Sequence, residues 1–114
     1  MKEKLGDKQR LLHIFDAIEE IESYIKESDQ NDFDNNSMMR FAAIKQLEII
    51  GEAVNHLSGQ IKDENPDVDW KAIIGLRNIT VHVYFGIDTS IIWNIVTNNL
   101  PDFKADVKRL IELN

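Results

Sequence analysis

The segment from Gly75 to Gly86, GLRNITVHVYFG, places an arginine, a histidine and a tyrosine close together among apolar residues. Histidine transfers protons near neutral pH, because its unperturbed pKa is about 6.5. Arginine stays charged, and its planar guanidinium matches the oxygens of a phosphate group. A tyrosine offers a phenol hydroxyl. Arg77, His82 and Tyr84 therefore suit acid–base chemistry on a phosphate, although surface decoration or a structural hydrogen-bond network also explains such a set.

Two amphipathic helices are predicted before this segment. Apolar residues spaced three and four apart predict a first helix over 7–28 and a second from Asn36 or Ser37 to Leu57. The stretches SDQNDFDNN and GQIKDENPDVD are predicted as connections. Gly51 lies inside the second helix, where it costs stability unless a neighbouring helix packs closely against it.

The segment itself lies in a predicted third helix. Asp69 is a suitable N-cap, so the helix starts near Trp70 and ends near Gly86. A fourth helix starts after Asp88, and Pro101 either kinks it or opens a fifth helix. Short connections between amphipathic helices predict an all-α fold, an antiparallel bundle of four to five helices.

The polar residues of the third helix share one side of an ideal helical wheel. We call this side the wedge; its polar members are Arg77, Asn78, His82 and Tyr84. The opposite side is the predicted core stripe of Ala72, Leu76, Ile79 and Val83. The wedge also carries the apolar residues Ile74 and Val81, which indicates that another surface covers it. A two-fold dimer would bring two wedges together and form a cleft.

Composition limits the classes of function. The 114 residues suit a single domain, and the net charge of −7 excludes a broadly basic nucleic-acid surface. Any RNA contact must therefore come from a small local site. Cysteine is absent, which excludes disulfides and zinc–thiolate sites and fits a reducing compartment. The N-terminal MKEKLGDKQR is no signal peptide, and the apolar runs are too short for a bilayer, so we expect a cytoplasmic protein without membrane contact.

The order Arg77-Asn78-Ile79-Thr80-Val81-His82-Val83-Tyr84 resembles the R-x-x-x-x-H-x-Y motif of HepT-like toxins, a branch of the HEPN (higher eukaryotes and prokaryotes nucleotide-binding) superfamily. IIGEAVNHLS, NPDVDWKAIIGLRN and HVYFGIDTSIIWNIVTNNLP are also similar to segments of that family, so the resemblance covers nearly the whole chain. It implies one HepT-like HEPN domain over 1–114, a homodimeric helical bundle and a metal-independent endoribonuclease toxin. It also implies a nucleotidyltransferase antitoxin as partner, which in some systems transfers AMP to the motif tyrosine.

Metal-free RNA cleavage uses the neighbouring 2′-hydroxyl as the nucleophile, so no cofactor or metal is expected. We assign general acid–base catalysis to His82 and phosphate binding to Arg77. Asn78 is expected to orient the imidazole or the phosphate, and Tyr84 is the candidate AMP acceptor. One imidazole cannot easily act as both base and acid in one step. A dimer supplies two copies of His82 and Arg77, which favours the dimer as the active unit.

Other polar and aromatic residues are more simply explained by structure than by catalysis. Glu48, Glu52 and His56 are spaced four apart on the second helix, opposite its apolar stripe, and are predicted to form a solvated or interface face. Trp70 and Trp93 are predicted to be packing anchors.

The alternative function is a catalytically silent helical binding module that is the partner or substrate of a nucleotidyltransferase. The acidic pI of about 4.8 favours this alternative, since phosphate contacts normally rely on positive charge.

Overall fold

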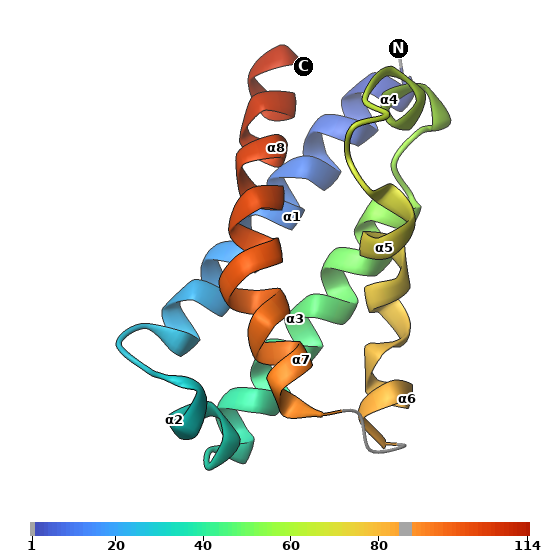
Figure 1. Cartoon of the computed structure of the whole chain (residues 1–114). Coiled ribbons are helices and arrows are strands. Elements are labelled where there is room, and N and C mark those ends of the chain that lie inside the picture. The colour runs from blue at the N-terminus through green and yellow to red at the C-terminus, as the bar shows by residue number, and fades with distance from the viewer. Residues whose placement is uncertain (1, 85–87) are drawn as a thin grey trace.

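Two long antiparallel helices form the centre of the fold (Figure 1). They are α1 (Lys2–Ile25) and α3 (Ser37–Asn55), which pack along most of their length. The computed structural model describes residues 2–84 and 88–114, with side chains for 6–81 and 88–114. Every regular element in these ranges is helical, so the predicted all-α class is confirmed.

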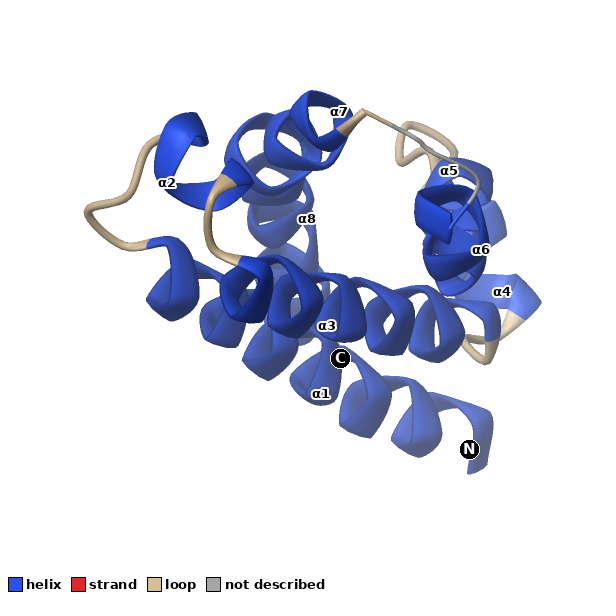
Figure 2. Cartoon of the chain, turned by 90° about the horizontal axis from the view of Figure 1, so that it is seen from below, coloured by secondary structure: helices blue, strands red, loops and turns tan. Residues whose placement is uncertain are grey.

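Two further helical segments pack against these central helices, and each changes its helix type along its length. The first joins α5 (Trp70–Gly75), the 3₁₀ turn η1 (Leu76–Asn78) and α6 (Ile79–Tyr84), and it packs against α3. The second joins α7 (Thr89–Asn94), the π-helical stretch η2 (Ile95–Asn99) and α8 (Leu100–Leu113), and its α8 part packs against α1. Figure 2 shows α5 and α6 on one side of the molecule and α7 and α8 on the other, with α3 running across beneath both groups.

The predicted apolar stripes form the core. Leu11, Ile14, Ile18 and Ile21 of α1 are fully buried, and so are the matching positions of α3, namely Ala43, Leu47, Ile50 and Val54. Trp70 lies edge-on to Phe103 with ring centroids 6.2 Å apart, and Trp93 lies 5.2 Å from Phe33. The interpretation of both tryptophans as packing anchors is therefore confirmed.

The two predicted connections contain short helices that the sequence analysis did not identify. The helix α2 (Gln30–Asp34) starts at Asp29, whose carboxylate accepts a hydrogen bond from the Asp32 amide at 2.8 Å, and it buries Phe33. The helix α4 (Gly59–Glu64) buries Ile61. Each is about one turn long, too short for an apolar period to appear, and each exists because one side chain anchors it in the core.

Pro101 lies in the first turn of α8 together with Asp102, so the second of its two predicted roles, the opening of a further helix, is confirmed. The chain widens into the π-helical η2 just before Pro101, and α8 then runs on as a regular helix. A proline lacks an amide hydrogen, and its ring collides with the carbonyl group four residues earlier. The wider turn removes this collision, and the Leu100 amide donates to the Ile95 carbonyl instead.

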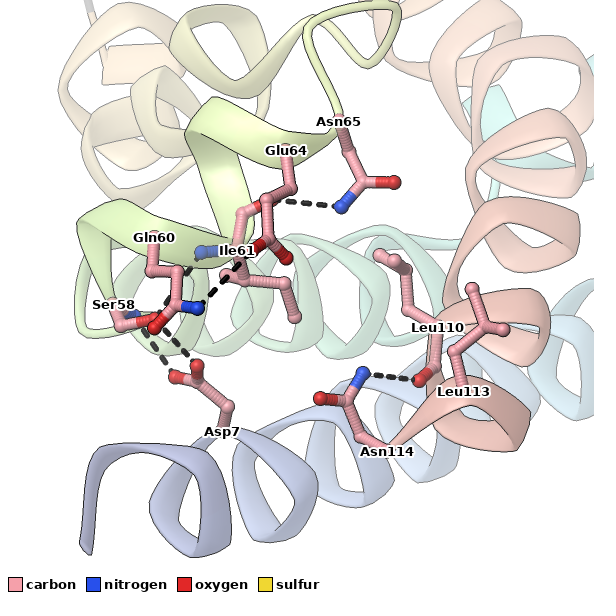
Figure 3. A pocket seen from close by; sticks show the side chains of 9 residues that line it. All are labelled: Asp7, Ser58, Gln60, Ile61, Glu64, Asn65, Leu110, Leu113 and Asn114. Carbon is pink, nitrogen blue, oxygen red and sulfur yellow. Dashed lines mark hydrogen bonds between the residues drawn. The ribbon is translucent and has the colours of Figure 1, made fainter. Parts of the chain in front are cut away.

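The first helix begins before its predicted start, and Asp7 lies within it as a buried carboxylate (Figure 3). Asp7 accepts hydrogen bonds from the backbone amide of Ser58 at 2.9 Å and from the Ser58 hydroxyl at 2.5 Å. The Ser58 Oγ in turn accepts from the Ile61 amide at 3.3 Å, as the N-cap of α4. Asp7 therefore fixes the end of the α3–α4 connection to α1.

None of the helices in the described ranges has the length and apolarity that a bilayer span requires.

Replacing Asp7 by alanine is expected to lower the free energy of unfolding by about 2 to 3 kcal/mol, since it leaves the Ser58 amide without its charged partner. Asp16 is an exposed carboxylate on the same helix, so Asp16→Ala is the matched control and should change stability by less than about 0.5 kcal/mol. Urea denaturation of the two variants measures the difference. Equal midpoints would show that the Asp7–Ser58 contact contributes nothing.

Candidate functional site

Arg77 lies in the middle of the 3₁₀ turn η1, between two buried anchors. Leu76 precedes it and Ile79 follows Asn78, with 9% and 4% of their surfaces exposed. Arg77 and Asn78 themselves are exposed. The apolar neighbours hold the backbone of the turn against the protein while the guanidinium and the amide face solvent. Within the described part of the chain, no carboxylate forms an ion pair with Arg77.

Gly51 of α3 is the point at which the turn meets its neighbour. A methyl group at position 51 would lie 3.0 Å from the Cα of Arg77 and 3.0 Å from the carbonyl carbon of Leu76, and closer still to the Arg77 amide nitrogen. These atoms belong to the backbone, so no side-chain rotation can relieve the contact. The condition under which a glycine is favourable inside α3 is therefore met, and the residue packed against Gly51 is the motif arginine.

The 3₁₀ turn corrects the ideal helical wheel. Residues in a 3₁₀ helix turn by about 120° rather than 100°, so the angles between Arg77 and later residues differ from those of a continuous α-helix. Leu76 and Ile79 are buried as predicted, but Ala72 is exposed, so its assignment to the core stripe is wrong. Ala72 lines a groove between α5 and α8 that neither helix covers. Val81 is 55% exposed and Ile74 is half-buried.

The side chains of His82, Val83 and Tyr84 lie outside the described residues, so their predicted positions on the wheel stay predictions. Their backbone belongs to α6, which starts directly after Asn78. Asn78 and His82 are therefore about one helical turn apart along the same segment.

The polar face of α3 is solvated, as predicted. The Glu52 carboxylate and the His56 imidazole lie 2.9 Å apart, and the two side chains are 56% and 58% exposed. Among the described residues, no group of three or more histidine, aspartate or glutamate side chains is arranged to hold a metal ion. Glu52 follows Gly51 directly, which places this hydrogen bond on the helix that supports the Arg77 turn.

Asp88 fixes the start of the helix that follows the motif. Its carboxylate accepts a hydrogen bond from the Ser90 amide at 2.9 Å and thereby caps α7. The hydrogen bond from the Ser90 backbone, with a smaller contribution from its hydroxyl, lowers the pKa of Asp88 below its ordinary value. The charged form is the better cap, because it faces the positive end of the helix dipole.

Known proteins are similar to this chain over most of its length. Residues 14–110 match the family described as ribonuclease HepT-like. A Methanocaldococcus jannaschii protein named "Putative RNase MJ1380" is 41% identical over 98 residues, which cover 86% of this chain and 90% of the relative. A Thermococcus cleftensis protein named "Probable ribonuclease HepT" is 34% identical over 107 residues, which cover 94% of this chain and 97% of the relative. No solved structure gives a significant match.

The family match spans most of the chain and includes the entire R-N-x-x-x-H-x-Y motif. The chain belongs to the HepT-like ribonuclease family. The resemblance stated from the sequence is therefore confirmed, and membership of this family implies that the substrate is RNA.

Proposed function

We propose that this protein is a metal-independent endoribonuclease toxin that cleaves RNA in the cleft of a homodimer and is neutralised by a nucleotidyltransferase antitoxin. The observation that carries the proposal is membership of the HepT-like ribonuclease family together with the complete motif on one helical segment. Relatives similar over almost their whole length carry ribonuclease names, which supports the same activity.

Arg77 is the proposed phosphate ligand. Its exposure, with Leu76 and Ile79 holding the backbone beneath it, leaves a fixed cation open to an RNA phosphate. His82 is the proposed general acid–base group, and it would move the proton of the attacking 2′-hydroxyl and that of the leaving 5′-oxygen. Asn78 lies between them in the chain as the proposed orienting amide. The expected products are a 2′,3′-cyclic phosphate and a 5′-hydroxyl.

A homodimer would supply two copies of each group to one cleft. The support for a dimer is an apolar strip on α3, which we call the exposed α3 stripe: Met38, Phe41 and Ile49, with 81%, 57% and 41% of their surfaces exposed. These positions share one helix face. Val81 of α6, in the middle of the motif, is also 55% exposed, and α6 packs against α3. A second copy covering this surface would bury it and bring two motifs together.

Tyr84 is the proposed target of the antitoxin. Its phenol oxygen would attack the α-phosphorus of ATP, with pyrophosphate leaving and the phenol proton passing to solvent or a base. An AMP group on Tyr84 would place a bulky anion in the cleft and repel the RNA phosphate from Arg77. Inactivation of this kind needs no unfolding.

The Tyr84→Phe variant is expected to gain no AMP when incubated with the antitoxin and ATP, because the acceptor oxygen is gone. Tyr24, the only other tyrosine, is half-buried and lies 3.3 Å from the Gln46 amide, so Tyr24→Phe is the matched control and should still be modified. Intact-mass spectrometry measures the added group. A Tyr84→Phe protein that still gains AMP would contradict the assignment.

Expression in bacteria distinguishes the toxin from the alternative function, a catalytically silent binding module. The net charge of −7 favours the binding module. We expect the wild type to arrest growth and the His82→Ala and Arg77→Ala variants to be harmless at equal protein levels. The growth rate after induction is the measurement. Equal growth of all three strains would support the binding module and reject the toxin.

A further inference from the structure

A groove of about 330 Å³ lies between α5 and the η2–α8 segment. Its lining residues come from α5, from η2 and α8, and from the turn before α5; Figure 1 shows where these helices lie. Its apolar lining consists of Val68, Ala72, Ile73, Leu76, Ile95 and Phe103. Phe103 is itself fixed by its edge-on contact with Trp70, so the base of the groove is a packed surface.

Four carboxylates line the same groove: Asp67, Asp69, Asp102 and Asp106. No lysine or arginine is among its lining residues. Asp69 is occupied as the N-cap of α5, at 3.1 Å from the Ala72 amide, and Asp106 lies 3.5 Å from the Arg109 guanidinium. Asp67 and Asp102 are exposed, and neither forms an ion pair with a residue in the described part of the chain. The groove thus combines an apolar base with two exposed carboxylates, Asp67 and Asp102, for which the described residues supply no ion-pair partner.

We propose that this acidic groove docks a segment of another protein in which lysine or arginine flanks a bulky apolar side chain. Charge complementarity selects that occupant, because cationic groups would meet Asp67 and Asp102 while the apolar side chain covers Ile73, Ile95 and Phe103. The volume is at the lower end of ligand pockets and suits one or two anchoring side chains of an interface.

RNA is excluded as the occupant by the same charges. Its phosphates would face four carboxylates and no cation, so the groove is separate in chemistry from the Arg77 site. The two are nevertheless neighbours in the chain, since Leu76 lines the groove and Arg77 follows it. The docking proposal rests on the groove alone and does not depend on ribonuclease activity.

The test is an NMR titration of the isotope-labelled protein with capped tetrapeptides. The probe Arg-Leu-Trp-Arg is expected to shift the backbone amides of Ala72, Ile73, Ile95 and Asn99. Glu-Leu-Trp-Glu, which reverses the charge, and Arg-Gly-Ser-Arg, which lacks the apolar side chains, should bind at least about ten-fold more weakly.

Matched variants separate the groove from general attraction of cations to an acidic protein. Asp67→Asn/Asp102→Asn should weaken binding of Arg-Leu-Trp-Arg about ten-fold. Asp16→Asn/Asp63→Asn removes the same two charges, taking the net charge from −7 to −5 in both cases, at exposed sites outside the groove, and should change binding less than about two-fold. Ala72→Trp, which fills the groove from an exposed position, should abolish binding with all carboxylates kept.

Four results would overturn the proposal. These are no shifts at the groove amides at millimolar probe, equal weakening in both double variants, equal binding of Arg-Gly-Ser-Arg, and displacement of the probe by Mg²⁺, which would indicate a cation site. Concentration-dependent shifts of the same amides without any probe would instead identify a second copy of this chain as the occupant.

Discussion

Gly51→Ala is expected to lower the free energy of unfolding by about 2 kcal/mol and to reduce RNA cleavage in the molecules that remain folded. Forcing a methyl group against backbone costs about 3 kcal/mol, and the better helix propensity of alanine recovers about 1 kcal/mol. The atoms that must move are the amide nitrogen and Cα of Arg77, together with the carbonyl carbon of Leu76. The strain therefore falls on the turn that presents the proposed phosphate ligand.

Gly75→Ala is the matched control for this prediction. Gly75 lies in the same region with helical φ of −58°, and a methyl group there would meet no atom within 4 Å. Alanine at this position is expected to raise stability by about 0.5 to 1 kcal/mol, because it restricts the unfolded chain. Urea denaturation gives the stabilities of both variants. A Gly51→Ala protein as stable as Gly75→Ala would show that α3 and η1 separate at no cost.

His82→Ala is expected to reduce the rate of RNA cleavage by about 10²- to 10⁴-fold, the usual contribution of a positioned proton-transfer group. Arg77→Ala should reduce it by about 10²- to 10³-fold, because the charge that steadies the transition-state phosphate is lost. Arg77→Lys should recover only part of this loss, since an ammonium keeps the charge but not the planar fork. Single-turnover cleavage of a labelled RNA measures all three rates.

Two controls accompany these rates. His13 is an exposed histidine on α1, and His13→Ala should cleave at the wild-type rate. The unfolding midpoint of the Arg77→Ala variant should match that of the wild type, because Arg77 is exposed and pairs with no described carboxylate. The midpoint of His82→Ala is measured in the same way, to show that the protein assayed for cleavage is folded. A His82→Ala protein that retains full activity would remove histidine from the mechanism, whatever happens to the arginine variants.

Apolar spacing was sufficient to predict the long helices. The stripe of Leu11, Ile14, Ile18 and Ile21 has a period that only an α-helix buries on one side, and its residues are fully buried. Asn36 and Asp69 were also predictable as helix starts, since their side chains accept hydrogen bonds from the amides three residues later. These signals come from residues close to one another in the chain, so they can be recognised in a single sequence.

The features missed depend on contacts between distant parts of the chain. Asp7 reads as a surface residue until Ser58 is placed beside it. Ala72 fits an apolar stripe on a wheel, but no helix covers that part of α5. The sequence raised close packing only as the condition that would offset the cost of Gly51, and the structure identifies Arg77 as the residue packed there. The carboxylates of Asp102 and Asp106 are spaced for one helix face, but their groove requires α5 opposite them.

Analysis of RNA ends after cleavage in excess EDTA is the most direct test of the central claim. Attack by the 2′-hydroxyl, assisted by His82 and Arg77 without a metal, predicts fragments that end in a 2′,3′-cyclic phosphate and begin with a 5′-hydroxyl. A 2′-deoxy nucleotide at the cleaved position should then block the reaction. Fragments with a 3′-hydroxyl and a 5′-phosphate, or cleavage that stops in EDTA and returns with a divalent metal, would contradict this mechanism.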